Sequence, residues 1–164
     1  MTSFEAEVLM LAQALRERGL MLASAESCTG GLIAAACTAV AGSSDWFERG
    51  FVSYSNAAKT EMLGVPAPLI DAHGAVSREV ALAMAEGALA HSQAHLAVAV
   101  TGIAGPGGAT PSKPVGTVWL AVARRGGAAQ AELLTLTGDR AAIRKHAVQH
   151  ALQRLLVCAA LPSG

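Results

Sequence analysis

The sequence has no excess of charge of either sign. Its 12 Lys and Arg residues balance 12 Asp and Glu residues, so the formal net charge at pH 7 is zero. Proteins that capture nucleic acid or an anionic membrane by electrostatics carry an excess of basic residues. No apolar run is long enough, and free enough of Gly and Pro, to predict a transmembrane helix. We therefore expect neither nucleic acid nor a membrane as a partner.

Cysteine is also scarce. The chain has three cysteines, Cys28, Cys37 and Cys158, and no CxxC spacing. An odd number of unpaired cysteines argues against a disulfide framework or a zinc site and fits reduced thiols. Residues 1–19, MTSFEAEVLMLAQALRERG, mix acidic with apolar residues, which predicts an amphipathic helix and not a signal peptide. The sequence thus predicts a cytoplasmic protein that holds no metal.

Apolar residues, in contrast, are abundant. They make up 52% of the 164 residues, which is enough to bury a full core, and the length favours one domain spanning residues 1–164. Short apolar runs alternate with segments of helical periodicity. The predicted strands are 20–25, 50–55, 94–102, 115–125 and 128–138. The predicted helices are one that ends at Gly19, then 32–42, 56–65 with Asn56 as its cap, 77–91 with Ser77 as its cap, and 139–156.

This order of elements predicts an α/β fold. Parallel strands need helical crossovers, whereas the last two strands flank the turn signal RGG and form an antiparallel hairpin. We therefore expect a five-stranded mixed sheet sandwiched between helices. Pro66 and Pro68 are expected to mark a turn.

The segment SAESCTGG, residues 24–31, follows the first predicted strand and precedes a helix. Open α/β sheets bind ligands beyond such strand ends, so Ser27 is a candidate nucleophile. The backbone N–H groups of Thr29, Gly30 and Gly31 would lie at the positive end of the helix, where they could stabilise an oxyanion or bind a phosphate. An equally weighted alternative makes Ser27 and Thr29 simple helix caps.

A serine hydroxyl needs a base to take its proton. Lys59 follows the predicted strand 50–55, and a lysine buried near a strand end can lose its proton and act as that base. Residue type alone favours the alternative of a solvated surface lysine, because lysines are seldom buried.

The segment 100–118, VTGIAGPGGATPSKPVGTV, is a glycine-rich loop between two apolar strands. Thr101 and the amides of Gly102, Gly105 and Gly107 could cradle a ligand there. The loop matches neither GxxxxGK[ST] nor the dinucleotide fingerprint, which argues against ATP or NAD bound in those modes. The alternative is a flexible lid without chemistry.

Taken together and in order, five segments resemble the CinA C-terminal domain family, whose stand-alone members are nicotinamide-nucleotide amidohydrolases. The segments are AESCTGG, GFVSYSNAAK, GAVSREVALAMAEGA, AVAVTGIAGPGG and KPVGTVWLAVA. The resemblance covers nearly the whole chain. It implies a three-layer α/β/α sandwich with a five-stranded mixed sheet, in agreement with the predicted elements.

The resemblance also implies an activity: hydrolysis of the carboxamide of nicotinamide mononucleotide (NMN) to nicotinate mononucleotide and ammonia, in pyridine-nucleotide salvage, with no metal or other cofactor. Ser27 and Lys59 match the catalytic positions of the family, with Tyr54 close to them, and Thr101 matches a further site residue. The candidates for binding the phosphate are the amides of GIAGPGG, residues 102–108, and Arg140, because arginine can hold phosphate with two hydrogen bonds.

Two alternatives compete with this assignment. Cys28 could be the nucleophile if the helix N-terminus lowers the pKa of its thiol. The chain could also be a non-catalytic nucleotide-binding or regulatory module, since the family's domain occurs fused in proteins named for competence. The presence of Ser27, Tyr54 and Lys59 favours the enzyme. A homodimer or larger homo-oligomer is expected.

Overall fold

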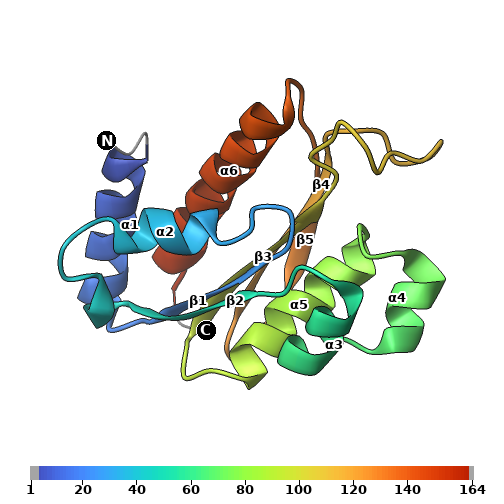
Figure 1. Cartoon of the computed structure of the whole chain (residues 1–164). Coiled ribbons are helices and arrows are strands. Elements are labelled where there is room, and N and C mark those ends of the chain that lie inside the picture. The colour runs from blue at the N-terminus through green and yellow to red at the C-terminus, as the bar shows by residue number, and fades with distance from the viewer. Residues whose placement is uncertain (1–3, 163–164) are drawn as a thin grey trace.

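The protein is described by a computed structural model over residues 4–162. Its centre is a mixed five-stranded sheet with the strand order β2-β1-β3-β4-β5 (Figure 1). β1 lies between β2 and β3 and is parallel to both, whereas β4 is antiparallel to β3 and β5 is antiparallel to β4. The strand bounds are β1 (Leu22–Glu26), β2 (Phe47–Val52), β3 (Leu96–Gly102), β4 (Thr117–Arg124) and β5 (Gln130–Thr135).

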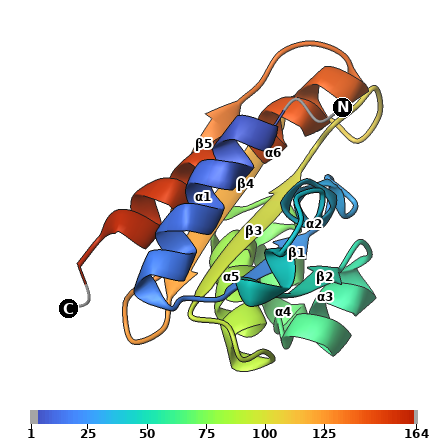
Figure 2. The same cartoon turned by 90° about the vertical axis from the view of Figure 1, so that its left-hand side faces the viewer.

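Helices lie on both sides of the sheet, which confirms the predicted α/β class (Figures 1 and 2). One side carries α1 (Glu5–Arg18), α2 (Leu32–Thr38) and α6 (Arg140–Ala160). The other carries α3 (Asn56–Leu63), α4 (Ala67–His73) and α5 (Arg78–Ala90). A short 3₁₀ turn, η1 (Ser43–Asp45), precedes β2. No helix within residues 4–162 is long and apolar enough to cross a membrane.

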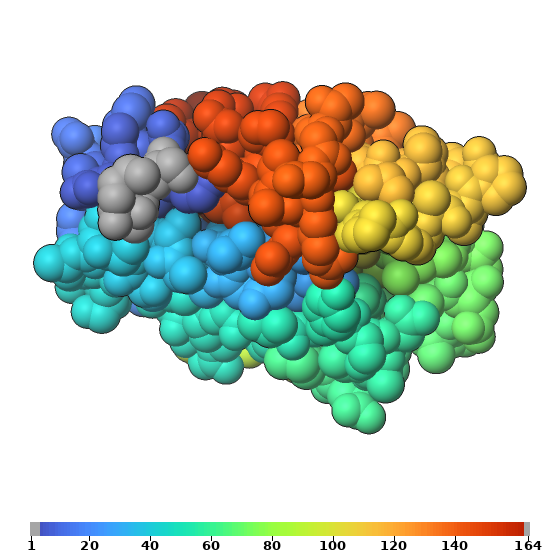
Figure 3. Space-filling view, turned by 45° about the horizontal axis from the view of Figure 1, so that its top comes forward, coloured from blue at the N-terminus to red at the C-terminus, as the bar shows by residue number. Residues whose placement is uncertain are grey.

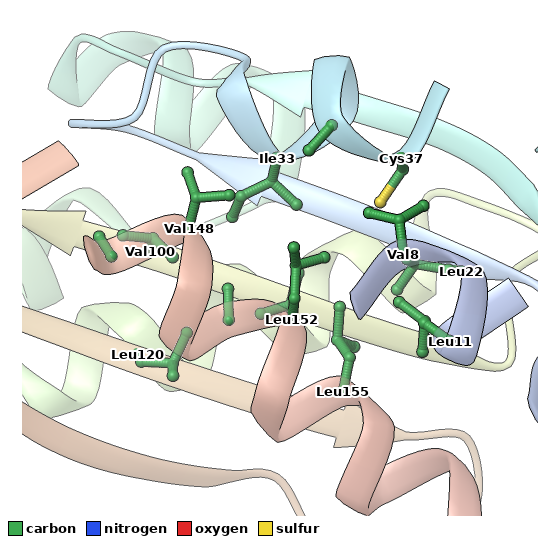
Figure 4. Close-up of a cluster of buried hydrophobic side chains, with 14 of the residues drawn as sticks. Val8, Leu11, Leu22, Ile33, Cys37, Val100, Leu120, Val148, Leu152 and Leu155 are labelled. Atoms are coloured by element: carbon green, nitrogen blue, oxygen red, sulfur yellow. The ribbon is translucent and has the colours of Figure 1, made fainter. Parts of the chain in front are cut away.

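The central strands are buried on both faces, as their apolar sequences predict. Alternate side chains of β1 and β3 point to opposite faces, with large residues toward α1 and α6 and alanines toward α5. The side chains on the face toward α1 and α6 form a hydrophobic cluster, shown in Figure 4, in which Leu22 and Val100 pack with Leu152 of α6. The alanine face lets α5 lie close to the sheet.

Three local predictions were wrong. Helix α3 is capped by Ser55 and not by Asn56: the Ser55 hydroxyl accepts the N–H of Ala58 at 3.0 Å. Pro66 lies in the connection after α3, as expected, but Pro68 lies in the first turn of α4, where a helix needs no N–H from it. Strand β2 ends at Val52, three residues before the predicted end, so residues 53–55 form a connection instead of strand.

The parallel arrangement places the carboxyl ends of three adjacent strands at one edge of the sheet. The chain leaves β1 at Ser27, leaves β2 before Tyr54 and leaves β3 after Gly102. Segments carrying the predicted catalytic residues, far apart in sequence, therefore meet at this edge, which is where open α/β sheets bind ligands.

Candidate active site

A cavity of about 210 Å³ opens at this edge of the sheet. Figure 3 shows this region, where the blue segment after β1, the teal segment after β2, the yellow loop after β3 and the orange-red start of α6 converge. The cavity is lined by Ser27, Cys28, Tyr54, Asn56, Lys59, Ala75, Val76, Thr101, Gly102, Ala104 and Arg140. It thus contains six of the sequence-predicted site residues together with the competing nucleophile.

Ser27 and Lys59 are in direct contact. The Nζ of Lys59 lies 3.1 Å from the Oγ of Ser27 and 3.0 Å from the carbonyl oxygen of Tyr54. Ser27 follows β1 directly and Lys59 lies in the first half of α3, whose start is fixed by the Ser55 cap. The Ser27 hydroxyl also donates to the Tyr54 carbonyl at 3.4 Å, and its oxygen accepts a hydrogen bond from Nζ of Lys59.

Lys59 is buried without a counter-ion. Its side chain is 1% exposed, and no ion pair found among the described residues includes it. Burial lowers the pKa of its ammonium group, because desolvation penalises the charged form, and the neighbouring Cys28 opposes this shift only in part. The alternative of a solvated surface lysine is therefore wrong.

Tyr54 contributes its backbone to this contact. Its side chain is 59% exposed, and its phenol oxygen accepts a hydrogen bond from Nη2 of Arg140 at 3.3 Å. Nη1 of the same guanidinium donates to the carbonyl of Gly105 at 2.8 Å. Arg140 therefore joins the start of α6 to both the segment after β2 and the glycine-rich loop, at the rim of the cavity.

Thr29, Gly30 and Gly31 do not line the cavity. The amide of Gly30 is not free, because it donates to the carbonyl of Ser27 at 3.0 Å. Glu26, a residue that the sequence analysis did not single out, occupies the N-terminal end of α2. Its carboxylate accepts the hydroxyl of Thr29 at 2.5 Å and two N–H groups in the first turn of α2 at 2.8 and 3.0 Å.

The glycine-rich loop divides between cavity and surroundings. Thr101 and Gly102 line the cavity, and the Thr101 hydroxyl donates to the carbonyl of Ala75 at 2.8 Å. Gly105 lies outside it and meets Arg140 through its carbonyl, as above. Gly107 also lies outside, with open space where a Cβ would point.

The expectation of a low thiol pKa at Cys28 is wrong. Burial raises the pKa of Cys28 to about 11, and the negative charge of Glu26 adds to the rise. The guanidinium groups of Arg144 and Arg140 oppose it to a smaller extent. Since the thiolate is the nucleophilic form, Cys28 is poorly prepared for attack at neutral pH.

Two further polar residues contribute to the site and were missed from the sequence. Asn56 lines the cavity beside Lys59. Arg144 donates from Nε to the carbonyl of Cys28 at 3.1 Å and from Nη2 to that of Thr29 at 3.3 Å, which fixes the nucleophile segment to α6. A glutamate in an otherwise apolar strand was the only sequence feature that could have predicted the hydrogen bonds between Glu26 and the first turn of α2.

A larger cavity, of about 650 Å³, lies between the β4–β5 hairpin and the C-terminal half of α6. It contains none of the predicted site residues. Two of its arginines are engaged by the protein itself: Arg154 pairs with Glu132, and Arg125 donates to the carbonyl of Leu89 near the end of α5 and to that of Ala94 after it. Across residues 4–162 no group of His, Cys, Asp and Glu has a metal-binding arrangement. The chemistry is therefore best sought in the smaller cavity.

Sequence comparison identifies relatives of two lengths. The chain is 51% identical to the nicotinamide-nucleotide amidohydrolase PncC of Escherichia coli K12 over 143 residues, which is 87% of each protein. It is 57% identical over 142 residues to a CinA-like protein of Akkermansia muciniphila, but there the match covers 34% of the relative. The chain thus spans about a third of the length of the CinA-like proteins that it matches.

Solved structures agree with the fold. The competence/damage-inducible protein CihA of Agrobacterium tumefaciens matches with a TM-score of 0.93 at 47% identity, over 96% of both chains. A CinA superfamily protein of Escherichia coli matches with a TM-score of 0.90 at 33% identity, over 97% of this chain and 91% of that one. The sequence model of the family described as CinA C-terminal domain matches residues 5–159 of the chain. The chain therefore belongs to the CinA C-terminal domain family.

Proposed function

We propose that the protein hydrolyses the carboxamide of NMN to nicotinate mononucleotide and ammonia, with Ser27 as nucleophile and Lys59 as general base. The observation that carries the proposal is the 3.1 Å contact between Ser27 Oγ and the buried Lys59 Nζ, which has no counter-ion among residues 4–162. The name of the full-length relative, a nicotinamide-nucleotide amidohydrolase, supports the choice of substrate.

In the first step the neutral amine of Lys59 accepts the hydroxyl proton of Ser27 while Oγ attacks the carboxamide carbon. The Tyr54 carbonyl holds the amine in place by accepting one of its N–H groups. When Lys59 is charged, its lone pair is gone and the Ser27 hydroxyl can turn to the Tyr54 carbonyl instead. The protonation state of Lys59 thus decides whether the nucleophile is activated.

In the second step the tetrahedral intermediate collapses. The carbon–nitrogen bond breaks, Lys59 returns the proton to the leaving nitrogen, and ammonia departs from an acyl-enzyme ester on Ser27. Water then attacks the ester with Lys59 again taking a proton. When the ester bond breaks, this proton goes back to Ser27 Oγ, and nicotinate mononucleotide is released.

The substrate phosphate needs a cation that is not part of this proton transfer. Lys59 and Arg140 are the two cationic residues that line the cavity, and Arg140 lies at its rim. Two N–H groups of Arg140 donate to Gly105 and Tyr54, and its other N–H groups can donate to a phosphate oxygen. We therefore assign the phosphate to Arg140 and the carboxamide to the inner end of the cavity.

The proposal extends to the setting of the reaction. The Ser/Lys pair supplies both nucleophile and base, so the reaction needs neither a metal nor an organic cofactor. We propose a role in pyridine-nucleotide salvage in the cytoplasm, as the family resemblance implies, and a homo-oligomeric state.

The test is ammonia release from NMN by the purified protein in the presence of EDTA, with Ser27→Ala measured beside it. Release by the wild type that is lost in Ser27→Ala supports a metal-independent serine amidohydrolase. A folded wild type that binds NMN without releasing ammonia would contradict the proposal and favour the nucleotide-binding module.

A further inference from the structure

The backbone of β3 presents alternate residues to its two neighbouring strands. On the β4 side, the N–H of Ile103 donates to the carbonyl of Thr117 at 2.9 Å, and the N–H of Arg125 donates to the carbonyl of His95 at 2.8 Å. Odd-numbered residues of β3 therefore direct their N–H and C=O groups toward β4. Because the direction alternates along a strand, the N–H of Gly102 points to the opposite side, toward β1.

Bonds on the β1 side agree with this alternation. The N–H of Leu96 donates to the carbonyl of Met21 at 3.1 Å, and the carbonyl of Val100 accepts the N–H of Ser27 at 3.0 Å. The next backbone group along this edge of β3 is the N–H of Gly102. In a continuing parallel ladder its acceptor would be the carbonyl of Ser27.

That acceptor is turned away. The carbonyl of Ser27 accepts the N–H of Gly30 at 3.0 Å as the chain bends toward α2, and the β1–β3 ladder ends at Glu26. Within residues 4–162 no hydrogen bond to the N–H of Gly102 is found outside the ladders. Gly102 also lines the cavity that holds Ser27 and Lys59. The donor therefore faces the reacting groups without a partner.

Packing requires a glycine at this position. A Cβ on residue 102 would lie 2.7 Å from Cγ2 of Val118 and 3.0 Å from the carbonyl oxygen of Thr117. The backbone of β3 therefore reaches the cavity edge with its N–H uncovered.

We propose that the N–H of Gly102 is the oxyanion donor of this site. The assignment rests on the proposed function, since the oxyanion is the former carboxamide oxygen after attack by Ser27. That oxygen would occupy the place where a further β1 carbonyl would have continued the ladder. Two nearby sets of donors are already engaged: Glu26 accepts the N–H groups of Ile33 and Ala34 in α2, and the Thr101 hydroxyl donates to the carbonyl of Ala75. A fixed backbone donor is well suited to this task because it needs no reorganisation when the charge develops.

The direct test replaces the N–H of Gly102 by an ester oxygen, through glycolic acid at position 102. This change adds no side chain, which matters because any Cβ there meets Val118. We expect kcat for NMN to fall about 100-fold, the usual effect of losing one oxyanion donor, with KM nearly unchanged. If the wild type is active and the ester variant has the same kcat, the assignment to Gly102 is overturned and the proposed function stays intact. A wild type that releases no ammonia would overturn both.

The matched control is an ester at Val100, two residues earlier on the same edge. There the N–H belongs to the β1–β3 ladder, so its loss should lower Tm while the folded protein keeps kcat within about threefold. Amide hydrogen exchange of the free protein gives a second readout, independent of activity. The N–H of Gly102 should exchange much faster than that of Val100, and equal protection of the two would show that Gly102 already has an acceptor and overturn the assignment.

Discussion

The carboxylate of Glu26 accepts the hydroxyl of Thr29 at 2.5 Å, one residue away from the nucleophile. The same carboxylate accepts the N–H groups of Ile33 and Ala34 and so neutralises the positive end of α2 from within the protein. A buried acid lies beside the catalytic pair, yet its charge is directed at the helix and not at Lys59.

Glu26→Ala should destabilise the protein by about 3 kcal/mol, because it leaves buried donors of the Thr29 segment and of α2 without acceptors. Urea unfolding measures the change. Glu26→Gln keeps one carbonyl oxygen for these donors and should lose less. Equal stability of the alanine variant and the wild type would contradict a capping role.

Ser27→Ala should reduce ammonia release from NMN by at least about 10⁴-fold, since it removes the atom that forms the acyl-enzyme. Cys28→Ala should keep activity within about tenfold, because the high pKa of this thiol leaves almost no thiolate at neutral pH. The two variants are matched controls for each other. Inactivity of Cys28→Ala together with activity of Ser27→Ala would exchange the two assignments.

Lys59→Met should abolish activity and raise stability. Methionine fills similar space without the cost of burying an ammonium group, and each kcal/mol relieved raises Tm by about 3 °C in a chain of this length. Lys59→Arg separates charge from basicity: arginine cannot become neutral, so this variant should be inactive and less stable than the wild type. A methionine variant that melts lower than the wild type would show that the buried amine is a net stabilising group.

The pH dependence follows from the lowered pKa of Lys59. The logarithm of kcat/KM should rise with pH as Lys59 loses its proton, with an apparent pKa below 10.5, the ordinary value of lysine. The unfolded chain binds this proton more tightly than the folded one. Stability should therefore rise with pH between the folded pKa and 10.5, and Lys59→Met should remove that part of the slope. A rate that falls with pH over this range would contradict the base role.

Arg140→Gln should raise KM for NMN by about 10- to 100-fold, the range expected for losing a charge-assisted hydrogen bond to phosphate. Nicotinamide riboside, which has no phosphate, is the control substrate, and its kcat/KM should change much less. Arg144→Gln acts on the nucleophile segment through two backbone carbonyls and should lower kcat for both substrates alike. Equal effects of Arg140→Gln on nucleotide and riboside would remove Arg140 from the phosphate site.

Much of the fold follows from patterns within single segments. The alternation of apolar runs and helical periodicity predicts the mixed sheet, and Ser77 caps its helix as expected. The errors lie where local signals have two meanings. Pro66 and Pro68 suit a turn and a first helical turn equally well, and the apolar run at 50–55 does not show where pairing with β1 stops.

The site was predictable only in part, for a different reason. Ser27 and Lys59 lie 32 positions apart, and no property of either residue shows that they touch; the family resemblance suggested the pair. Thr29, Gly30 and Gly31, whose amides were expected to face the substrate, do not line the cavity, and the Gly30 N–H donates to the carbonyl of Ser27. The exposed donor of Gly102 depends on strand pairing, which the residue type does not encode.

The antiparallel pairing of β3 and β4 has a practical consequence for handling the protein. Gly102 lies opposite Val118 at the active-site edge, whereas Leu96 lies opposite Arg124 at the far edge. The turn that follows, with open space around Gly126, is therefore a full strand length away from the chemistry. A fluorophore, an affinity tag or a tether to an electrode could be attached at that turn with the catalytic edge still facing solution.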